Sequence, residues 1–346
     1  MNKTIAFHSN QLSVTGTEVA LYDYAHYNET LLGNRSVVLY HRGNPNNHPD
    51  ALAKFSQRFE VLAYNHLGEL DDVLAQGQAD LMYAIKAGKR DGVVAKHIPT
   101  LVHAVFPTAP WQAHGSTYAY ISEWLSRECS NNEIPTVPHI VAMPDIDDDL
   151  RAELGIDRNA LVMGCYGGAK SYDVPCAVSG ALRLLNSRSD VFFVFMHLTP
   201  FIEHPRAIFL PGTTDMARKT RFINTCDVMV HARAQGESFG LACGEFSVRN
   251  KRVMTYKHCK HTHHHDVLGS KGLYYGTEEE FVHIINNLDR TALANGQWDC
   301  YTPRYNPERV MQLFDQHLIR PALMGAPTYR PSLKARWAYV RHKTKS

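Results

Sequence analysis

The sequence predicts an α/β protein made of two doubly wound domains that face each other across a cleft. Its 346 residues exceed what one hydrophobic core usually accommodates. Strand-like and helix-like segments alternate along most of the chain, which favours parallel sheets covered by helices. A proline-rich and acidic stretch at residues 135–158 interrupts that alternation. We therefore place one domain at residues 1–142 and the other at residues 143–305.

The first domain begins with a strand, a helix and a second strand. The helix, at residues 17–32, carries Val19, Leu21, Tyr22 and Ala25 at helical spacing. The strand TIAFHS precedes it and the strand SVVLY, residues 36–40, follows it, so this βαβ unit implies a parallel sheet. Further strands are expected at residues 80–84 and 100–106 and near Glu60 and Tyr118, and a helix with Ser122 as its cap is expected at 122–127.

The second domain repeats the alternation. Strands are expected at residues 160–165, 191–197, 207–210, 227–231, 252–256 and 273–275, and helices at 174–187, 215–225, 240–249 and 277–288. Ligands of a doubly wound sheet bind beyond the carboxyl ends of its strands. The candidate functional residues should therefore lie in the loops that follow these strands.

Composition narrows the function class. The net charge is only +2, which argues against a nucleic-acid binder with a broad basic surface. The seven cysteines are widely spaced and form no CxxC pair, so we interpret them as reduced thiols of a cytoplasmic protein. The N-terminus, MNKTIAFHSN, has no apolar region of signal-peptide length, and the longest apolar run, VFFVFM, is too short to span a membrane.

The most informative segment is residues 231–256. A strand ends there in a polar loop, which opens at Phe239 and Gly240 onto a helix beginning LACGEF. Unpaired N–H groups and the helix dipole make such a start suitable for a phosphate, and Gly240 allows close approach of the backbone. Glu237 and Glu245 are eight residues apart, which is roughly 12 Å along a helix. That reach fits the sugar and the ribose of a nucleotide diphosphosugar; two solvated carboxylates are the alternative.

This segment resembles the E-x7-E signature of family 4 glycosyltransferases and their retaining relatives of the GT-B fold, which has two Rossmann-like domains. The resemblance spans roughly residues 3–318. It implies that Glu237 contacts the donor sugar and Glu245 the ribose. It also implies that the other donor-binding residues here are Arg233, Ser238, Phe239, Gly240 and Leu241. Residues 306–320 look like the final helix of such enzymes, which crosses back to the first domain, and residues 321–346 form a basic tail.

The segment GCYGGAKSYDVP, residues 164–175, is similar to a second motif of that family. The family commonly has an Arg after the first Gly and a Lys five residues later, both directed at the diphosphate. Lys170 matches the Lys, and its charge would stabilise the leaving group without a metal. Cys165 stands at the Arg position, so Arg233, Lys219 or Arg221 would have to supply that charge. A solvated loop lysine is the alternative for Lys170.

The first domain contains two further matches. Gly16, in the loop after the first strand, matches a glycine that faces the diphosphate in the family, although Thr15 replaces its usual glycine neighbour. An ordinary turn explains a lone glycine equally well. His103 ends another strand, where the family often has a catalytic histidine close to the transferred sugar. A histidine hydrogen-bonded in the interior is the alternative.

Two clusters receive no functional assignment. HCKHTHHH, residues 258–265, offers nitrogen and sulfur ligands for zinc or copper, but adjacent histidines often bind metal adventitiously, and no second cluster has finger-like spacing. We therefore expect no metal and no cofactor. The tail contains six Lys or Arg and no acid. Weak contact with a membrane surface is one interpretation, and a frayed basic terminus is the more common one.

The sequence thus predicts a glycosyltransferase that moves a sugar from a nucleotide-diphosphate donor to an acceptor hydroxyl, with retention and without a metal. A glycan, a lipid-linked compound and a protein remain open as acceptors. Two alternatives remain: an enzyme of the same architecture such as a sugar-nucleotide epimerase, and a non-catalytic binding relative. A nicotinamide enzyme is disfavoured because G-x-G-x-x-G follows neither first strand.

Overall fold

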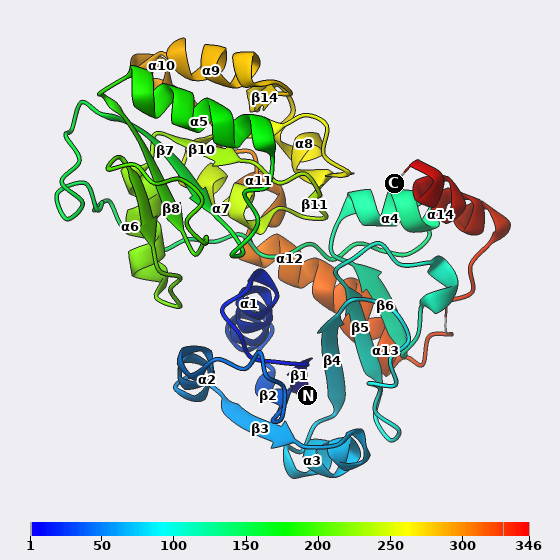
Figure 1. The fold of residues 1–346 in the computed structure, drawn as a ribbon. Helices are drawn as coiled ribbons and strands as arrows, with labels where there is room; N and C mark the ends of the chain where they lie inside the picture. Colours follow the sequence, from blue (N-terminus) through cyan, green and yellow to red (C-terminus); the bar gives the residue numbers. More distant parts are fainter. Residues whose placement is uncertain (1, 328, 346) are drawn as a thin grey trace. The chain divides into compact units, whose positions relative to one another are not determined.

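The computed structural model describes residues 2–327 and 329–345. The chain divides into two compact units (Figure 1). Unit 1 contains residues 1–140 and returns at residues 305–346, and unit 2 contains residues 141–304. The limits expected from the sequence are 142/143 and 305/306, close to these. Each unit is built on a six-stranded parallel sheet, which confirms the predicted fold class of two doubly wound α/β domains.

The sheet of unit 1 has the strand order β3-β2-β1-β4-β5-β6. Its strands are β1 (Thr4–Ser9), β2 (Arg35–His41), β3 (Glu60–Tyr64), β4 (Leu81–Lys86), β5 (Thr100–Ala104) and β6 (Thr117–Tyr120). Its helices before residue 140 are α1 (Gly16–Thr30), α2 (Pro49–Ser56), α3 (Leu70–Gln76) and α4 (Glu123–Ser130). The expected cap of α4 is confirmed, because Ser122 Oγ accepts the amide of Leu125 at 3.2 Å. The short helices α2 and α3 were not predicted.

Helices cover both faces of this sheet. On one face, Phe7 packs against Tyr83, and both rings contact Phe314 from the C-terminal part of the chain. On the other face, Leu70 and Leu74 of α3 belong to a separate buried cluster with strand residues. Cover on both faces explains why every residue of β4 and β5 is buried, with no alternation between buried and exposed positions.

The sheet of unit 2 has the order β14-β12-β10-β7-β8-β9, which is the same topology counted from the opposite edge. Its strands are β7 (Leu161–Tyr166), β8 (Val191–Met196), β9 (Ala207–Leu210), β10 (Val228–His231), β12 (Arg252–Tyr256) and β14 (Leu273–Tyr275). Its helices include α5 (Pro175–Ser187), α6 (Met216–Thr225), α7 (Leu241–Val248), α8 (His263–Leu268), α9 (Glu278–Asn286) and α10 (Arg290–Asn295). A two-residue ladder joins β11 (Gly236–Glu237) to β13 (His261–Thr262).

The core of unit 2 lies between β7 and its neighbours on one side and α5 and α9 on the other. Met163 and Cys165 of β7 pack there with Ala181 of α5 and Phe281 of α9. Gly164 faces the opposite side, where a side chain would collide with Cys226 and Phe246. Figure 1 shows α5 and α9 above the sheet, with α6 and α7 on its other face.

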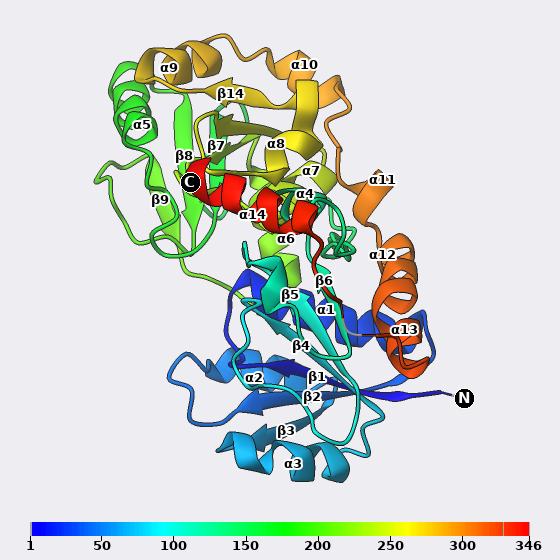
Figure 2. The ribbon, with the colours of Figure 1, turned by 90° about the vertical axis from the view of Figure 1, so that its right-hand side faces the viewer.

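The C-terminal part of the chain belongs to unit 1. It forms α11 (Thr302–Tyr305) at the boundary, α12 (Pro307–Phe314), a π-helical turn (Asp315–Ile319) and α13 (Arg320–Leu323), and α12 runs beside α1 (Figure 2). Phe314 anchors α12 to the core, with its ring 5.1 Å from that of Tyr24.

The sequence favoured a frayed basic terminus, and that prediction is wrong. Helix α14 (Leu333–Lys345) packs on α4 and buries Ala335 and Ala338.

None of the helices in the described part of the chain combines the length and apolar character that crossing a membrane requires.

Candidate functional site

The loops that follow β7 and β10 meet at the point where the strand order of unit 2 reverses. The backbone amide of Asp173 donates to the carbonyl of Ala232 at 2.9 Å, and its carboxylate accepts the amide of Ala234 at 2.7 Å. These bonds fix the two loops against each other. Most of the predicted donor-site residues of unit 2 lie on these loops and on α7, beyond the carboxyl ends of the strands, where doubly wound sheets bind ligands.

Helix α7 starts in the manner that phosphate binding requires. Gly240 is its N-cap with a left-handed backbone, φ +90°, and no side chain caps the helix. The first intrahelical bond runs from the amide of Gly244 to Gly240 O at 2.9 Å, so the amides of Leu241–Cys243 have no partner within the helix. A side chain at Gly240 would lie 3.1 Å from His264 and 3.4 Å from Glu237. The left-handed backbone favours glycine at this position, and the space around it is tight.

The carboxylate of Glu237 is held beside this helix start. Its Oε1 accepts from Arg233 Nη1 at 2.9 Å and lies 3.3 Å from His231 Nε2. Burial alone would raise the pKa of Glu237, but the hydrogen bond from His231 and the charge of Arg233 together bring that pKa below its usual value. The side chain keeps 24% of its surface exposed. Glu237 is thus an ionised and oriented carboxylate with an oxygen left for a ligand.

The 12 Å reach derived from an uninterrupted helix does not apply to this segment. Glu237 lies on the short strand β11, residues 238–240 form a turn, and only Glu245 is on α7. Helical rise therefore sets the position of Glu245 relative to Gly240 but not relative to Glu237. The order of strand, turn and helix was predicted correctly, and the distance between the two carboxylates stays a prediction.

Glu245 is buried and paired with a cation. Only 3% of its side chain is exposed, and its Oε1 accepts a short hydrogen bond from Lys219 Nζ of α6. The same ammonium lies 4.1 Å above the ring of Tyr166, the last residue of β7. This excludes the solvated carboxylate considered from sequence for Glu245. Its contact with a ribose stays a prediction.

Cys165 stands where the related enzymes have an arginine, so another cation of unit 2 would have to offset the charge of a diphosphate. Cys165 lies within β7 and points into the core, where burial raises the pKa of its thiol well above the usual value. Of the proposed substitutes, Lys219 is paired with Glu245, and Arg221 Nε pairs with Asp148 at 2.9 Å. Lys170 is exposed on the loop after β7. Arg233 pairs with Glu237 at 2.9 Å but keeps 38% of its side chain exposed beside the start of α7. These two remain as cations for a diphosphate.

Phe239 has a packing role. Its side chain is 2% exposed and stacks on His263 with ring centroids 5.5 Å apart. Ser238 and Leu241 on either side of the turn are partly exposed. Phe239 therefore anchors the turn through its contact with His263, and its contact with a ligand stays a prediction.

In unit 1, Gly16 begins α1 as expected and is exposed. The preceding loop is organised by Glu18, a buried carboxylate that accepts from Ser9 at 3.1 Å and from Ser13 at 2.6 Å. Thr15, which stands where the family has the first of its two successive glycines, donates to the same carboxylate at 2.5 Å. The threonine therefore fixes the loop, and its hydroxyl is engaged inside the unit.

The structure favours the interior alternative for His103. Its ring is fully buried, Nδ1 lies 2.8 Å from Tyr83 Oη, and Nε2 lies 2.7 Å from Val137 O. Burial lowers the pKa of this ring, so it is neutral near pH 7, donates from Nε2 to the carbonyl of Val137 and accepts at Nδ1 from the Tyr83 hydroxyl. No ring nitrogen is left for a sugar, so we withdraw the catalytic assignment of His103.

His103 should make unit 1 sensitive to acid. Burial lowers the pKa of His103 from 6.5 to about 4. Between pH 6.5 and 4, the histidine is therefore protonated in the unfolded chain and neutral in the folded protein. The stabilisation is complete above pH 6.5 and is lost as the pH falls towards 4, by about 3 kcal/mol in total. The variant His103→Gln should flatten that part of the pH profile in thermal unfolding. A profile parallel to wild type would contradict the buried neutral ring.

Sequence reasoning missed two residues that organise the site. His231 ends β10 and bonds to Glu237 through Nε2 and to Thr255 Oγ1 of β12 through Nδ1, at 2.9 Å. Thr255 Oγ1 in turn lies 3.0 Å from His264 Nε2. His231 could have been identified from the sequence, because it ends a predicted strand and stands six residues before Glu237. The contact with Thr255 depends on the pairing of β10 with β12, which sequence does not reveal.

No protein-family model and no curated protein sequence matches the chain. Solved structures resemble it over nearly their whole length. A glycosyltransferase from Rickettsia africae is 10% identical with a TM-score of 0.61, covering 99% of this chain and 98% of its own. Anabaena HepE in complex with UDP-glucose is 15% identical with a TM-score of 0.60, covering 94% and 98%. S. aureus MnaA with UDP is 12% identical with a TM-score of 0.59, covering 96% and 99%.

These likenesses establish the fold. Together with the same strand order in both sheets, they show that the chain has the GT-B fold of two Rossmann-like domains. At 10–15% identity they carry no residue-level assignment.

Proposed function

We propose that this protein is a glycosyltransferase that uses a nucleotide-diphosphate sugar as donor and binds it on unit 2. The observation that carries the proposal is the uncapped start of α7 at Gly240, with the ionised Glu237 beside it and Glu245 one turn further along the helix. The helix start suits a diphosphate, Glu237 suits the hydroxyls of a sugar, and Glu245 suits the diol of a ribose. Complexes of HepE with UDP-glucose and of MnaA with UDP, on the same fold, support this proposal.

Each group has a distinct role in the proposed complex. The amides of Leu241–Cys243 receive the diphosphate, since unpaired N–H groups and the helix dipole favour an anion. Glu237 accepts hydrogen bonds from sugar hydroxyls through the oxygen that Arg233 and His231 do not use. Glu245 offers its Oε2 to the ribose diol while Lys219 holds Oε1. The buried ion pair therefore orients the nucleotide-binding carboxylate.

The chemical step follows a retaining, metal-independent route in this proposal. The bond from the anomeric carbon to the diphosphate oxygen breaks, and a bond to the acceptor oxygen forms on the same face of the sugar. The acceptor proton passes to the leaving phosphate. Negative charge grows on the diphosphate during this step, and Lys170 and Arg233 stabilise it, as cations placed at developing charge do in general. Cys165 takes no part in this chemistry.

The acceptor side belongs to unit 1 in this proposal. Leu333, Trp337 and Val340 are exposed on α14, with Lys334, Arg336 and Arg341 on the same exposed helix. Apolar and basic side chains on one helix suit weak contact with an anionic membrane surface. This arrangement favours a membrane-associated acceptor over a soluble glycan.

A thermal-shift panel of UDP, GDP, dTDP and ADP sugars tests the proposal. A ligand at 100 times its Kd should stabilise the protein by about 2.7 kcal/mol, which raises Tm by several degrees. Glu245→Ala should abolish the shift, and Glu203→Ala, an exposed glutamate of unit 2, should leave it unchanged. If no nucleotide sugar shifts Tm, or if Glu245→Ala responds like wild type, the proposed donor site is wrong.

Product analysis separates transfer from the two alternatives. With the stabilising donor and a mixture of acceptors, a transferase forms a glycoside and free nucleoside diphosphate. A sugar-nucleotide epimerase alters the sugar without an acceptor, and a binding relative leaves the donor intact. Loss of donor consumption in Lys170→Ala, with the thermal shift retained, would support a catalytic role of that cation.

A further inference from the structure

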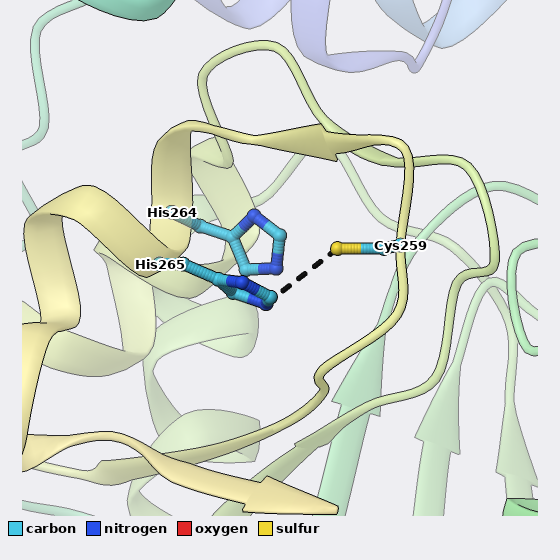
Figure 3. Close-up of side chains that lie close together, drawn as sticks. All are labelled: Cys259, His264 and His265. Atoms are coloured by element: carbon cyan, nitrogen blue, oxygen red, sulfur yellow. Dashed lines mark hydrogen bonds between the residues drawn. The ribbon is translucent and has the colours of Figure 1, made fainter. Parts of the chain in front are cut away.

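The histidine-rich segment after β12 folds into a cluster of three ligands. Cys259 lies on the loop between β12 and β13, and His264 and His265 lie on α8. Their ligand atoms all lie within 4.8 Å of one another, and the side chains converge on one point (Figure 3). The sequence offered six candidate ligands at residues 258–265 without indicating which of them meet.

The spacing fits a tetrahedral ion. Cys259 Sγ lies 3.5 Å from His265 Nε2. Bonds of about 2.3 Å from zinc to sulfur and about 2.05 Å to nitrogen, at a tetrahedral angle, place two such ligands about 3.6 Å apart. The third ligand atom, on His264, lies within 4.8 Å of both others. Thiolate and imidazole together are the ligands that zinc prefers among the common divalent ions.

The cluster is mostly buried, and His265 is its most exposed member. Cys259 is 8% exposed and His264 is fully buried. Gly236 covers the thiol, and a side chain at that glycine would lie 2.8 Å from Cys259 Sγ. The ladder between β11 and β13 fixes this arrangement. In contrast, His258 of the same segment is exposed, as expected of a histidine that binds ions adventitiously.

One ring nitrogen of the buried His264 makes no hydrogen bond. His264 Nε2 lies 3.0 Å from Thr255 Oγ1, while its Nδ1 is buried without a hydrogen-bond partner. A buried ring nitrogen without a partner is costly in a folded protein. Coordination by one ring nitrogen fixes the tautomer of the other, which is how groups around metal sites usually hold their histidines.

We propose that Cys259, His264 and His265 bind one zinc ion that braces the loop carrying Glu237. The three side chains supply one sulfur and two nitrogens and leave the fourth position to water. His264 connects through Thr255 to His231, which bonds to Glu237. The ion therefore stabilises the short ladder that positions Glu237 and takes no part in the chemical step, so the proposed reaction at the diphosphate remains metal-independent.

Cobalt substitution of the full-length protein tests this proposal directly. After dialysis against a chelator, one equivalent of Co²⁺ should give a thiolate-to-cobalt charge-transfer band in the near ultraviolet and visible bands of tetrahedral intensity. One equivalent of Zn²⁺ should then remove both. This measurement needs no variant and no sugar donor, so its outcome is independent of the proposed function.

Variants assign the ligands. Cys259→Ser should lose the charge-transfer band, and Cys259→Ser and His265→Gln should each weaken zinc affinity at least 100-fold in calorimetry. His258→Gln is the matched control in the same segment and should bind like wild type. Ion binding without a thiolate band, or binding lost only in His258→Gln, identifies an adventitious surface site and overturns the proposal. Transfer activity that survives complete zinc removal would refute the bracing of Glu237.

Discussion

Replacing Lys219 with methionine should destabilise the protein by about 3–5 kcal/mol, because the substitution leaves the carboxylate of Glu245 buried without its counter-charge. The methionine fills most of the space of the lysine stem, so lost packing contributes little. Urea denaturation of the full-length chain measures the change. Thermal unfolding should show a fall in Tm of roughly 10 °C.

Two further variants separate charge from packing. Lys257→Met removes a lysine whose partner, Glu280, lies 2.7 Å away on the surface, and it should cost less than about 1 kcal/mol. The double variant Lys219→Met with Glu245→Leu should recover most of the lost stability, since no buried charge remains. It should still fail to bind nucleotide, because Glu245 is absent. A Lys219→Met variant as stable as Lys257→Met would contradict a buried pair.

Replacing Glu237 with glutamine should lower kcat/KM for sugar transfer by about 10²–10³-fold, the usual loss when one preorganised polar contact is removed from an active site. The amide keeps the shape of the carboxylate but loses the charge that Arg233 and His231 orient. Affinity for the nucleoside diphosphate should change only a few-fold, since the helix start and Glu245 hold that part of the donor. Steady-state kinetics and calorimetry with the diphosphate measure both quantities.

Glu203→Gln is the control for this experiment, because it makes the same substitution on an exposed loop of unit 2. It should leave kinetics and binding unchanged. The role assigned to Glu237 would be refuted if its variant turned over as fast as this control. Weakened diphosphate binding with normal turnover would instead place Glu237 at the nucleotide.

The sequence predicted the fold well because its signals are local. Ser122 and Asp215 stand at helix starts, and in the structure both side chains accept backbone amides of the first turn. Buried strands such as VFFVFM are apolar throughout, as strands covered on both faces must be. The short helices α2 and α3 were missed because seven or eight residues carry too little periodicity.

The sequence predicted which segment carries the candidate donor site, but it did not predict which side chains pair with Glu237 and Glu245. Gly240 was correctly placed at a helix start, because the residues that show this, from Glu237 to Glu245, follow one another in the sequence. The partners of Glu245 and Glu237 come from α6 and from the end of β10, and tertiary packing alone brings them there. Cys165 and His103 were judged by position along a strand, but which face of the sheet each residue occupies decides whether it meets solvent or core. The ligand cluster at Cys259 depends on the β11 and β13 ladder in the same way.

Hydrogen exchange in the presence of the nucleotide that gives the largest thermal shift tests the central claim most directly. The amides of Leu241–Cys243 have no partner within α7, so they should exchange rapidly in the free protein and slow markedly when a diphosphate accepts from them. Protection of residues 241–243, together with the loop that carries Lys170, is the expected result. A nucleotide that binds yet leaves these amides unprotected, and protects residues of unit 1 instead, would contradict the proposed donor site.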